Sequence, residues 1–218
     1  MRILRPLVAV AVSPAFVLAL PLAVPATAAP SCPAVEVIFA RGTYEPAGLG
    51  SVGQAFVDAL VPQLGARTVE VYPVDYPATD DYANSAAAGA ADVESRIGQI
   101  AAACPATKIV MGGYSQGAAV MGMATSAIPP TAGDHVAAVA VFGSPASGFS
   151  TMLNGGAPLP TLSPAYAAKA IDLCTPGDPI CSPGADLFAH TSYIQSGMVD
   201  EAATFAASKI TPATTAAG

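Results

Sequence analysis

Short apolar runs with almost no polar residues alternate along this chain with longer stretches of helical spacing. The first run, Ala34 to Ala40, reads AVEVIFA, which is typical of a strand buried on both faces. The next stretch, Ser51 to Leu64, carries apolar residues at helical intervals, namely Val52, Phe56, Ala59, Leu60 and Leu64. Strands that alternate with helices in this way predict an α/β fold with a parallel sheet covered on both faces.

The same patterns continue to the end of the chain. Further strands are expected at 69–74, 108–112, 136–142 and 170–174, and further helices at 84–104, 116–128 and 198–210. The stretch from Gly143 to Pro164 is rich in Gly, Ser and Pro, and is expected to be a loop with at most short local structure. The sequence has no internal repeat, so we expect one domain, residues 29–210.

Composition excludes several classes of protein. Hydrophobic residues make up 53% of the chain and charged residues 11%, whereas disordered chains combine low hydrophobicity with high net charge. Without the first 28 residues, six basic residues remain against 15 acidic ones, a net charge of −9 with histidine neutral. Nucleic-acid binding requires clustered Lys and Arg. We therefore expect no nucleic-acid partner and no attachment to membranes through a polybasic segment.

The N-terminus has the pattern of an export signal. Two arginines in the first five residues precede an apolar run over residues 7–24, and Ala26-Thr27-Ala28 follows, as at a signal-peptidase site. An uncleaved membrane anchor is the alternative, but Pro14 and Pro21 interrupt the run. No later stretch reaches the ~20 apolar residues of a membrane span. We predict a signal peptide over 1–28 cleaved near Ala28, a secreted protein without membrane insertion, and a flexible tail over 211–218.

Secretion favours disulfide bonds for the four cysteines, because the extracellular environment is oxidising; they are Cys32, Cys104, Cys174 and Cys181. Four cysteines allow three pairings. Pairing Cys174 with Cys181 closes a tight loop and leaves Cys32 for Cys104, and loop entropy would then contribute about 2.5 kcal/mol for the short loop and about 4.4 kcal/mol for the long one. A zinc site is the alternative, but it would require Cys-x-x-Cys spacing or nearby histidines, and the sequence has neither.

The third predicted strand leads into the motif Gly113-Tyr114-Ser115-Gln116-Gly117. Gly-x-Ser-x-Gly between a strand and a helix is the pattern of a nucleophile elbow, in which the glycines permit a sharp turn that exposes the serine hydroxyl. The N-terminus of the following helix directs partial positive charge at the same place. A plain structural turn is the alternative, since Gly and Ser are common residues. The strand–turn–helix context favours Ser115 as a catalytic nucleophile.

A serine hydroxyl needs a base at neutral pH, and the chain has two histidines. His135 begins a predicted strand, which favours a structural role, and it would leave only Asp134 or later aspartates to orient its ring. His190 lies 75 residues after Ser115 in an irregular stretch. It permits the order Ser, then Asp or Glu, then His of α/β-hydrolases. His190 is therefore the expected base.

Asp172, Asp178 and Asp186 are the candidates for the carboxylate that orients His190. Asp178 lies within the proposed disulfide loop, Cys-Thr-Pro-Gly-Asp-Pro-Ile-Cys, and a rigid mount suits a residue that must fix an imidazole tautomer. Asp172 lies within a strand, where its side chain is less free, and Asp186 also fits a solvated loop residue. We expect Asp178. A carboxylate pair for glycoside hydrolysis is conceivable, but no pair stands out among the 15 acidic residues.

Acyl transfer also needs hydrogen-bond donors that stabilise the negative charge on the oxygen of the reacting carbonyl group. One is expected to be the backbone N–H of Gln116, directly after the nucleophile, and the second should come from the loop after an early strand. The segment Ala40-Arg41-Gly42-Thr43 follows the first strand, and Thr43 offers both a backbone N–H and a hydroxyl. The alternative is an ordinary turn in which Arg41 forms a structural ion pair.

Together, Ala-Arg-Gly-Thr, Gly-Tyr-Ser-Gln-Gly, the Cys-x-x-x-Asp-x-x-Cys loop and the late histidine resemble the cutinase family, particularly the secreted cutinase-like esterases of actinobacteria. The resemblance spans about 32–210. It implies a three-layer α/β-hydrolase with a five-stranded parallel sheet flanked by helices. It also implies a catalytic triad, two oxyanion donors and two disulfide bonds, which are Ser115, Asp178 and His190, then Thr43 and Gln116, then Cys32–Cys104 and Cys174–Cys181.

The expected reaction is hydrolysis of fatty-acyl esters or polyesters through an acyl-serine intermediate, with no cofactor and no metal. The sequence between the fourth strand and Asp178 contains no long amphipathic helix that could form a large lid. This predicts an open site that faces lipid or polyester chains at a surface. Six apolar residues are candidates for its lining, Leu49, Met152, Leu153, Ile180, Leu187 and Phe188.

Other functions remain open from the sequence. The same triad could serve a phospholipase, a thioesterase or an acyltransferase, and turnover of phospholipids and acyl-CoA would distinguish them from a simple esterase. A non-catalytic surface-binding protein on a hydrolase fold would be favoured if a triad member were missing, and none is. A secreted peptidase is disfavoured, because no side-chain specificity pocket is evident. Nothing in the sequence argues against a monomer.

Overall fold

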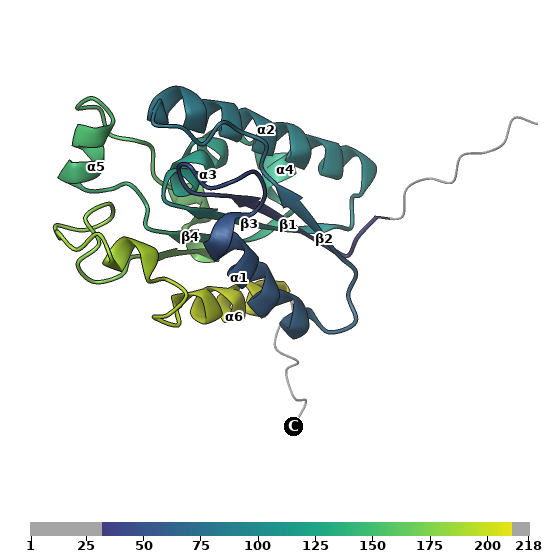
Figure 1. Cartoon of the computed structure of the whole chain (residues 1–218). Helices are drawn as coiled ribbons and strands as arrows, with labels where there is room; N and C mark the ends of the chain where they lie inside the picture. The colour runs from purple at the N-terminus through teal and green to yellow at the C-terminus, as the bar shows by residue number, and fades with distance from the viewer. Residues whose placement is uncertain (1–31, 211–218) are drawn as a thin grey trace, which may run out of the picture. The chain divides into compact units, whose positions relative to one another are not determined.

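Five parallel strands form one central sheet in the computed structural model, which describes residues 32–210 (Figure 1). The strands lie in the order β2-β1-β3-β4-β5. Their bounds are Val35–Ala40 for β1, Val69–Pro73 for β2, Lys108–Tyr114 for β3, Val136–Phe142 for β4 and Ala170–Leu173 for β5. The expected five-stranded parallel sheet is confirmed. The predicted signal peptide (1–28) and tail (211–218) lie outside the described residues.

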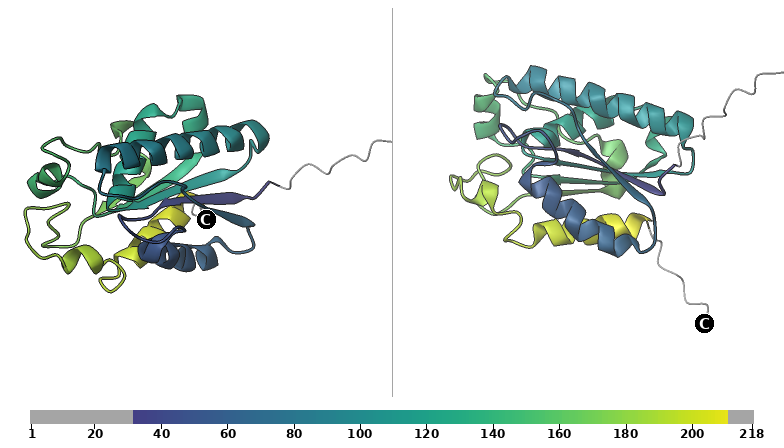
Figure 2. Two further views of the ribbon diagram at one scale, coloured as in Figure 1. Left: turned by 45° about the horizontal axis from the view of Figure 1, so that its top comes forward. Right: turned by 45° about the vertical axis from the view of Figure 1, so that its right-hand side comes forward.

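Four helices cover the two faces of this sheet and make the fold a three-layer sandwich (Figure 2). On one face lie α2 and α3, Tyr82–Ala103 and Gln116–Ala127; on the other lie α1 and α6, Gly50–Leu60 and Met198–Ile210. Two short helices, α4 (Pro130–Gly133) and α5 (Gly148–Leu153), lie in the connections. The central strands β1, β3 and β4 are almost fully buried, and they carry apolar side chains in both directions, as their sequences predicted. The edge strands β2 and β5 are partly exposed.

The core consists of two apolar clusters separated by the sheet. The cluster under α2 and α3 contains alternate strand residues such as Ile38 and Met111. The cluster under α1 and α6 contains the intervening residues, and three phenylalanine rings lie at its centre. The ring centroids of Phe39 and Phe56 are 5.9 Å apart, and those of Phe56 and Phe142 are 6.1 Å apart. Aromatic pairs at this spacing add to the free energy gained from burial.

One connection differs in detail from the sequence prediction, and a second contains the short local structure that the prediction allowed. The helix expected to reach Leu64 ends at Leu60 and continues as a 3₁₀ turn, Val61–Leu64, because Pro62 has no N–H to donate within an α-helix. The expected loop Gly143 to Pro164 contains α5. The hydroxyl of Ser147 accepts the Ser150 N–H at the start of α5, and such a cap stabilises a short helix.

The order of the strands determines where a site can form. From β1 the chain passes to β2 on one side and then crosses back to β3 on the other side. The segments that follow β1 and β3 therefore diverge to opposite faces, and they leave a crevice at the carboxyl ends of these two strands. In open α/β sheets, ligands bind at such a switch point.

The two ends of the described chain meet at the opposite end of the sheet. Cys32 and Ile210 line one surface hollow there, together with Val35 and Lys108 at the starts of two strands. A disulfide bond joins Cys32 to Cys104, just after α2. Within residues 32–210, no helix has the length and apolar character that crossing a membrane requires.

Candidate active site

Ser115 lies at the turn between β3 and α3, in a backbone conformation that side chains rarely adopt. Its φ is 56° and its ψ is −117°, which places its hydroxyl outside both the strand and the helix. The turn is tight, because a β-carbon at Gly113 would lie 2.2 Å from the carbonyl oxygen of Gly117. The backbone N–H of Ser115 donates to the carbonyl of Phe142 at 2.8 Å, so the turn is also tied to the end of β4.

Gln116 holds the N-terminus of α3 in place through its side chain. The side chain is buried, its Nε2 donates to the carbonyl of Thr79 at 2.7 Å, and its Oε1 accepts the hydroxyl of Ser85 at 3.0 Å. These bonds connect the start of α3 to the start of α2. The positive end of the α3 helix dipole therefore lies beside Ser115, the residue that precedes the helix.

His190 reaches Ser115 from the short 3₁₀ turn Ala189–Thr191. Its Nε2 lies 2.9 Å from Ser115 Oγ, and its Nδ1 lies 2.8 Å from Asp178 Oδ2. An ionised carboxylate can only accept hydrogen bonds, so the proton of the neutral ring lies on Nδ1 and Nε2 is free to accept the serine proton. The structure thus brings together the three residues predicted as a triad.

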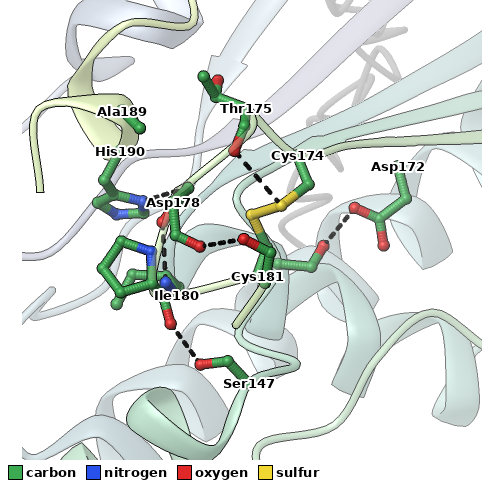
Figure 3. The surroundings of a disulfide bond; sticks show 12 residues. Ser147, Asp172, Cys174, Thr175, Asp178, Ile180, Cys181, Ala189 and His190 are labelled. Carbon is green, nitrogen blue, oxygen red and sulfur yellow. Dashed lines mark hydrogen bonds and ion pairs between the residues drawn. A yellow bond between two sulfur atoms is a disulfide. The ribbon is translucent and has the colours of Figure 1, made fainter. Parts of the chain in front are cut away.

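Asp178 is fully buried. It lies in the loop that the Cys174–Cys181 disulfide closes (Figure 3). Its Oδ1 accepts the N–H of Ile180 at 2.8 Å. Burial by itself would raise the pKa of this carboxyl, but hydrogen bonds from His190, Tyr193 and the Ile180 N–H hold the pKa below its ordinary value of 3.8. The carboxylate therefore stays ionised and in a fixed orientation beside the imidazole ring.

Two tyrosines that the sequence interpretation passed over enclose the His190 ring. Tyr114 stacks on it with centroids 5.1 Å apart, and its hydroxyl donates to the His190 carbonyl at 2.7 Å. Tyr193 packs edge-on to the ring with centroids 6.3 Å apart, and its hydroxyl donates to Asp178 Oδ2 at 2.5 Å. Position 114 is a free position of the Gly-x-Ser-x-Gly motif, and Tyr193 lies outside every motif, so the only sequence signal was proximity to Ser115 and His190.

The loop after β1 is held rigidly beside Ser115. Glu45 accepts the N–H groups of Gly42 and Ser51, each at 2.7 Å. Arg41 is buried, and its guanidinium donates to the carbonyls of Glu45 at 2.9 Å and Tyr76 at 2.7 Å. Arg41 thus binds backbone carbonyl groups in this loop, and the structural ion pair considered as an alternative is absent among residues 32–210. These bonds fix the position of Thr43.

A cavity of about 210 Å³ opens directly above the serine. Ser115, His190, Thr43 and Gln116 line it together with a mainly apolar wall, which consists of Tyr82, Tyr114, Pro145, Ser150, Leu153, Leu159 and Ile180. Of the six apolar residues suggested from the sequence, Leu153 and Ile180 belong to the lining. The remaining four, Leu49, Met152, Leu187 and Phe188, do not.

The other candidate residues have partners away from Ser115. The Nδ1 of His135 lies 3.2 Å from the carbonyl of Thr107. Asp172 accepts the hydroxyl of Ser144 at 2.8 Å, and Asp186 accepts the N–H of Phe188 at 2.9 Å. Within the described residues, no cluster of three or more His, Cys, Asp or Glu side chains could hold a metal ion. The site therefore consists of a serine, a histidine and an aspartate in hydrogen-bond contact beside a small cavity.

The sequence of this chain matches a known protein family and two of its curated relatives. The family model described as Cutinase matches residues 31–210. Carboxylesterase Culp1 of Mycobacterium tuberculosis is 56% identical over 179 residues, which cover 82% of this chain and 82% of Culp1. Phospholipase Culp4 of the same organism is 46% identical over 220 residues, with 96% of this chain and 92% of Culp4 covered.

Solved structures give the same result for the fold. A Trichoderma reesei cutinase in complex with a phosphonate inhibitor has a TM-score of 0.67 at 34% identity, over 83% of this chain and 78% of that one. The catalytic core domain of acetyl xylan esterase from Trichoderma reesei has a TM-score of 0.70 at 26% identity, over 82% of this chain and 100% of that one. Both likenesses cover more than four fifths of this chain.

Proposed function

Because this chain belongs to the cutinase family and is a serine carboxylic ester hydrolase, we propose that Ser115, His190 and Asp178 form its catalytic triad. The observation that carries this proposal is the chain of hydrogen bonds from Ser115 Oγ through the imidazole ring to the buried carboxylate, at 2.9 Å and 2.8 Å. A positioned base within this distance is what a serine hydroxyl requires to act as a nucleophile.

The proposed reaction proceeds in two halves. Ser115 Oγ attacks the ester carbonyl carbon while His190 Nε2 takes the hydroxyl proton, and the resulting imidazolium is stabilised by Asp178. The tetrahedral intermediate collapses, the alkoxide leaves with the proton from Nε2, and the acyl group stays on the serine. Water then gives a proton to Nε2 and attacks the acyl carbon. The carboxylic acid leaves, and Ser115 regains its proton.

Thr43 and Gln116 are the proposed oxyanion donors. Both line the cavity beside Ser115, and Gln116 begins α3, where backbone N–H groups and the helix dipole favour negative charge. The hydrogen bonds of Arg41 and Glu45 in the loop before α1 support this role, because they hold Thr43 in position before substrate binds. Such preorganised donors need no rearrangement when the charge develops.

An exposed apolar rim includes the cavity-lining Leu153, and it suggests where the substrate comes from. We define this rim as Phe149, Met152 and Leu153 on α5 with Leu187 and Phe188. Phe188 is 86% exposed and Met152 63% exposed. In Figure 1, α5 and the segment that precedes the 3₁₀ turn at Ala189 lie at the same end of the molecule. Apolar patches of this kind mark surfaces that contact other apolar material, so we propose that the site works at lipid or polyester surfaces.

We also propose that the protein is secreted and that it acts as a monomer. The two disulfide bonds fit an oxidising compartment. The proposed signal peptide over 1–28 would deliver the chain there. The proposed substrate is a fatty-acyl ester, so no nucleic-acid partner and no membrane insertion are required.

Phospholipid hydrolysis is the second candidate, because the relative Culp4 is named a phospholipase. No Lys or Arg belongs to the lining of the cavity in the described part of the chain. A phosphate headgroup would therefore meet no cationic side chain in the cavity, which favours esters of uncharged alcohols.

The test is hydrolysis of p-nitrophenyl esters over a range of acyl lengths by the mature protein and by Ser115→Ala. We expect activity on short to medium chains and a loss of about 10⁴-fold or more in the variant, as for other serine hydrolases. Phospholipid and acyl-CoA turnover are measured beside it. Full activity in a folded Ser115→Ala variant would refute the triad, and faster phospholipid turnover would favour the second candidate.

The rim is tested separately with Phe188→Ser. We expect slower hydrolysis of emulsified or polymeric esters, because less apolar area contacts the interface, and an unchanged rate on a soluble short ester. Val61→Ser is the matched control, since Val61 is also exposed but lies in the 3₁₀ turn after α1. Equal behaviour of the two variants on emulsified esters would argue against an interfacial role of the rim.

A further inference from the structure

Tyr193 has no assigned role, yet its hydroxyl touches the proposed triad. The side chain is fully buried, and its ring packs edge-on against Tyr114 and Phe142, with centroid distances of 5.8 Å and 5.9 Å. The hydroxyl lies 2.5 Å from Asp178 Oδ2. Asp178 Oδ2 also lies 2.8 Å from His190 Nδ1. Asp178 Oδ2 therefore receives two donors, one from each ring.

The direction of the Tyr193 hydrogen bond follows from its other neighbours. The backbone N–H of Thr175 donates to the Tyr193 oxygen at 3.3 Å, so the hydroxyl proton points elsewhere. Cys181 Sγ lies 3.5 Å away, but a disulfide sulfur is a weak acceptor beside an ionised carboxylate. Burial and the neighbouring Asp178 charge raise the pKa of Tyr193. The hydroxyl therefore stays protonated and donates a hydrogen bond to Asp178.

Little space surrounds this arrangement. A β-carbon at Gly143 would lie 2.9 Å from His190 Cε1 and 3.0 Å from the Tyr193 oxygen. Gly143 also has a φ of 61°, which glycine adopts without strain. The end of β4 therefore presses its backbone against both rings, and neither ring can move far from Asp178.

We propose that Tyr193 is a positioning residue of this esterase, whose hydroxyl fixes the Asp178 carboxylate and shares its charge with His190. The proposal rests on the proposed triad. In the transition state the His190 ring becomes an imidazolium that Asp178 must stabilise. A second donor on the same oxygen draws part of the negative charge away from the ring, and it stops the carboxylate from rotating. Tyr193 thus affects both how readily the imidazole is protonated and how well it is oriented.

Other charged or titratable groups contact this ring or belong to the segments packed around it, and Tyr193→Phe changes none of them. Tyr114 lies on one face of the ring, and Glu45 in the loop after β1 acts on Tyr114 through its charge. Asp178 lies at Nδ1, and Asp186 precedes the turn that carries His190, where it accepts the Phe188 N–H. A comparison of Tyr193→Phe with the parent protein therefore isolates one hydroxyl group.

The experiment measures kcat and KM for a soluble p-nitrophenyl ester from pH 4 to pH 9 in Tyr193→Phe. Without the hydroxyl the Asp178 charge acts on His190 alone, so the imidazolium persists to higher pH. We expect the acidic limb of the kcat/KM profile to move to higher pH by roughly half a unit to one unit. We expect kcat on the plateau to fall roughly tenfold as the carboxylate loses its fixed orientation, with KM unchanged.

Tyr72→Phe is the matched control. Its hydroxyl donates to Asp92 on α2 at 2.9 Å, so the variant also loses a tyrosine–aspartate hydrogen bond. Neither of these two residues lines the cavity. The control should keep the parent profile. If Tyr193→Phe shows lower thermal stability but the same acidic limb and the same kcat as this control, Tyr193 is merely structural and the proposal is wrong.

A second readout does not depend on turnover. The proton between His190 Nδ1 and Asp178 should give a strongly deshielded NMR signal. Its assignment is simple because the chain has two histidines and no tryptophan. In a Ser115→Ala background, adding Tyr193→Phe should move this signal. An unmoved signal would overturn the positioning role, whereas ester hydrolysis that survives Ser115→Ala would overturn the triad itself.

If Tyr193→Phe does not fold, ring-fluorinated tyrosine placed at position 193 keeps the shape and strengthens the donor. The acidic limb should then move to lower pH. A limb that stays unchanged, or moves to higher pH, would refute the proposal.

Discussion

A β-carbon on Gly117 would lie 2.0 Å from the carbonyl oxygen of Ala40. The first turn of α3 therefore passes the end of β1 in direct backbone contact. This contact places the Ser115 turn next to the loop that carries Thr43, and the proposed nucleophile and one proposed oxyanion donor both line the cavity. The second glycine of the Gly-x-Ser-x-Gly motif is thus required by the neighbouring strand as well as by the turn itself.

Gly117→Ala should disrupt the elbow. The added methyl group would meet rigid backbone, so we expect the free energy of unfolding to fall by about 3 kcal/mol and ester hydrolysis to be lost. Urea unfolding and p-nitrophenyl ester assays would check this. Gly98→Ala is the control, because Gly98 lies exposed on α2 with open space around it, and alanine there should stabilise the helix by about 0.5–1 kcal/mol. A fully active Gly117→Ala protein would contradict the close contact.

The two disulfide bonds should make different contributions. Cys174–Cys181 closes the loop that holds Asp178, across a sequence separation of 7, whereas Cys32–Cys104 spans a separation of 72. Replacing Cys32 and Cys104 by serine should cost about 4.4 kcal/mol of stability and leave activity at 25 °C in the molecules that stay folded. Replacing Cys174 and Cys181 should cost about 2.5 kcal/mol but reduce kcat more strongly.

The measurements for the disulfide variants are thermal melting and kcat under non-reducing conditions. The parent protein treated with a reductant gives a third sample, in which both effects should combine. The opposite order, with kcat more sensitive to the long-range disulfide, would show that the Asp178 loop keeps its shape without its covalent closure.

Asp178 should make stability fall in acid. Its pKa in the folded protein lies below the ordinary value of 3.8, so its ionised form stabilises the fold above that pH, and the contribution is lost as the pH falls through the folded pKa. Urea unfolding of the parent protein between pH 6 and pH 2 should therefore show a loss that is smaller in Asp178→Asn. Burial raises the pKa of Glu36 and gives the opposite slope, but it does so in both proteins and cancels in the comparison.

Asp58→Asn is the control for this acid titration. Asp58 is exposed on α1, where it accepts the side-chain amide of Gln54 at 2.8 Å. Its replacement should leave the parent slope unchanged. If Asp178→Asn also keeps the parent slope, the three hydrogen bonds to the carboxylate do not lower its pKa as described.

Net charge should control adsorption to anionic surfaces. Residues 32–210 carry six basic and 15 acidic side chains, a net charge of −9 with histidine neutral. We expect weak adsorption to vesicles that contain phosphatidylglycerol at low salt, and stronger adsorption as salt screens the repulsion over about 10 Å at 0.1 M. Vesicle sedimentation would measure it, with uncharged phosphatidylcholine vesicles as the control. Adsorption to anionic vesicles that does not depend on salt would refute this prediction.

The sequence was sufficient for the layers of the fold, because the apolar pattern of each element directly reflects which faces are buried. Strand β4 and helix α6 have the predicted bounds, 136–142 and 198–210. The order of the strands in the sheet could not be predicted from these apolar patterns. It depends on which crossover each helix makes, and α2 carries the chain from β2 past β1 to β3.

The candidate site was likewise only partly predictable from the sequence. Ser115, Asp178 and His190 could be suggested because chain order and the disulfide loop restrict the choice, and the structure places them in hydrogen-bond contact; their catalytic roles stay predictions. Tyr193 could not be suggested, because its hydroxyl finds Asp178 only after two loops fold against each other. The residues that line the cavity could not be predicted either. From the sequence, Phe188 was as plausible a lining residue as Ile180, and only the loop geometry distinguishes them.

The hollow lined by Cys32 and Ile210 has a consequence for engineering. The described chain enters and leaves at the same point, at the end of the sheet opposite the cavity above Ser115. A tether to a solid support or a fused partner attached at either end would leave the apolar rim facing outward. A linker that joins residue 210 to residue 32, with new ends opened in an exposed loop, should give a circular permutant that folds.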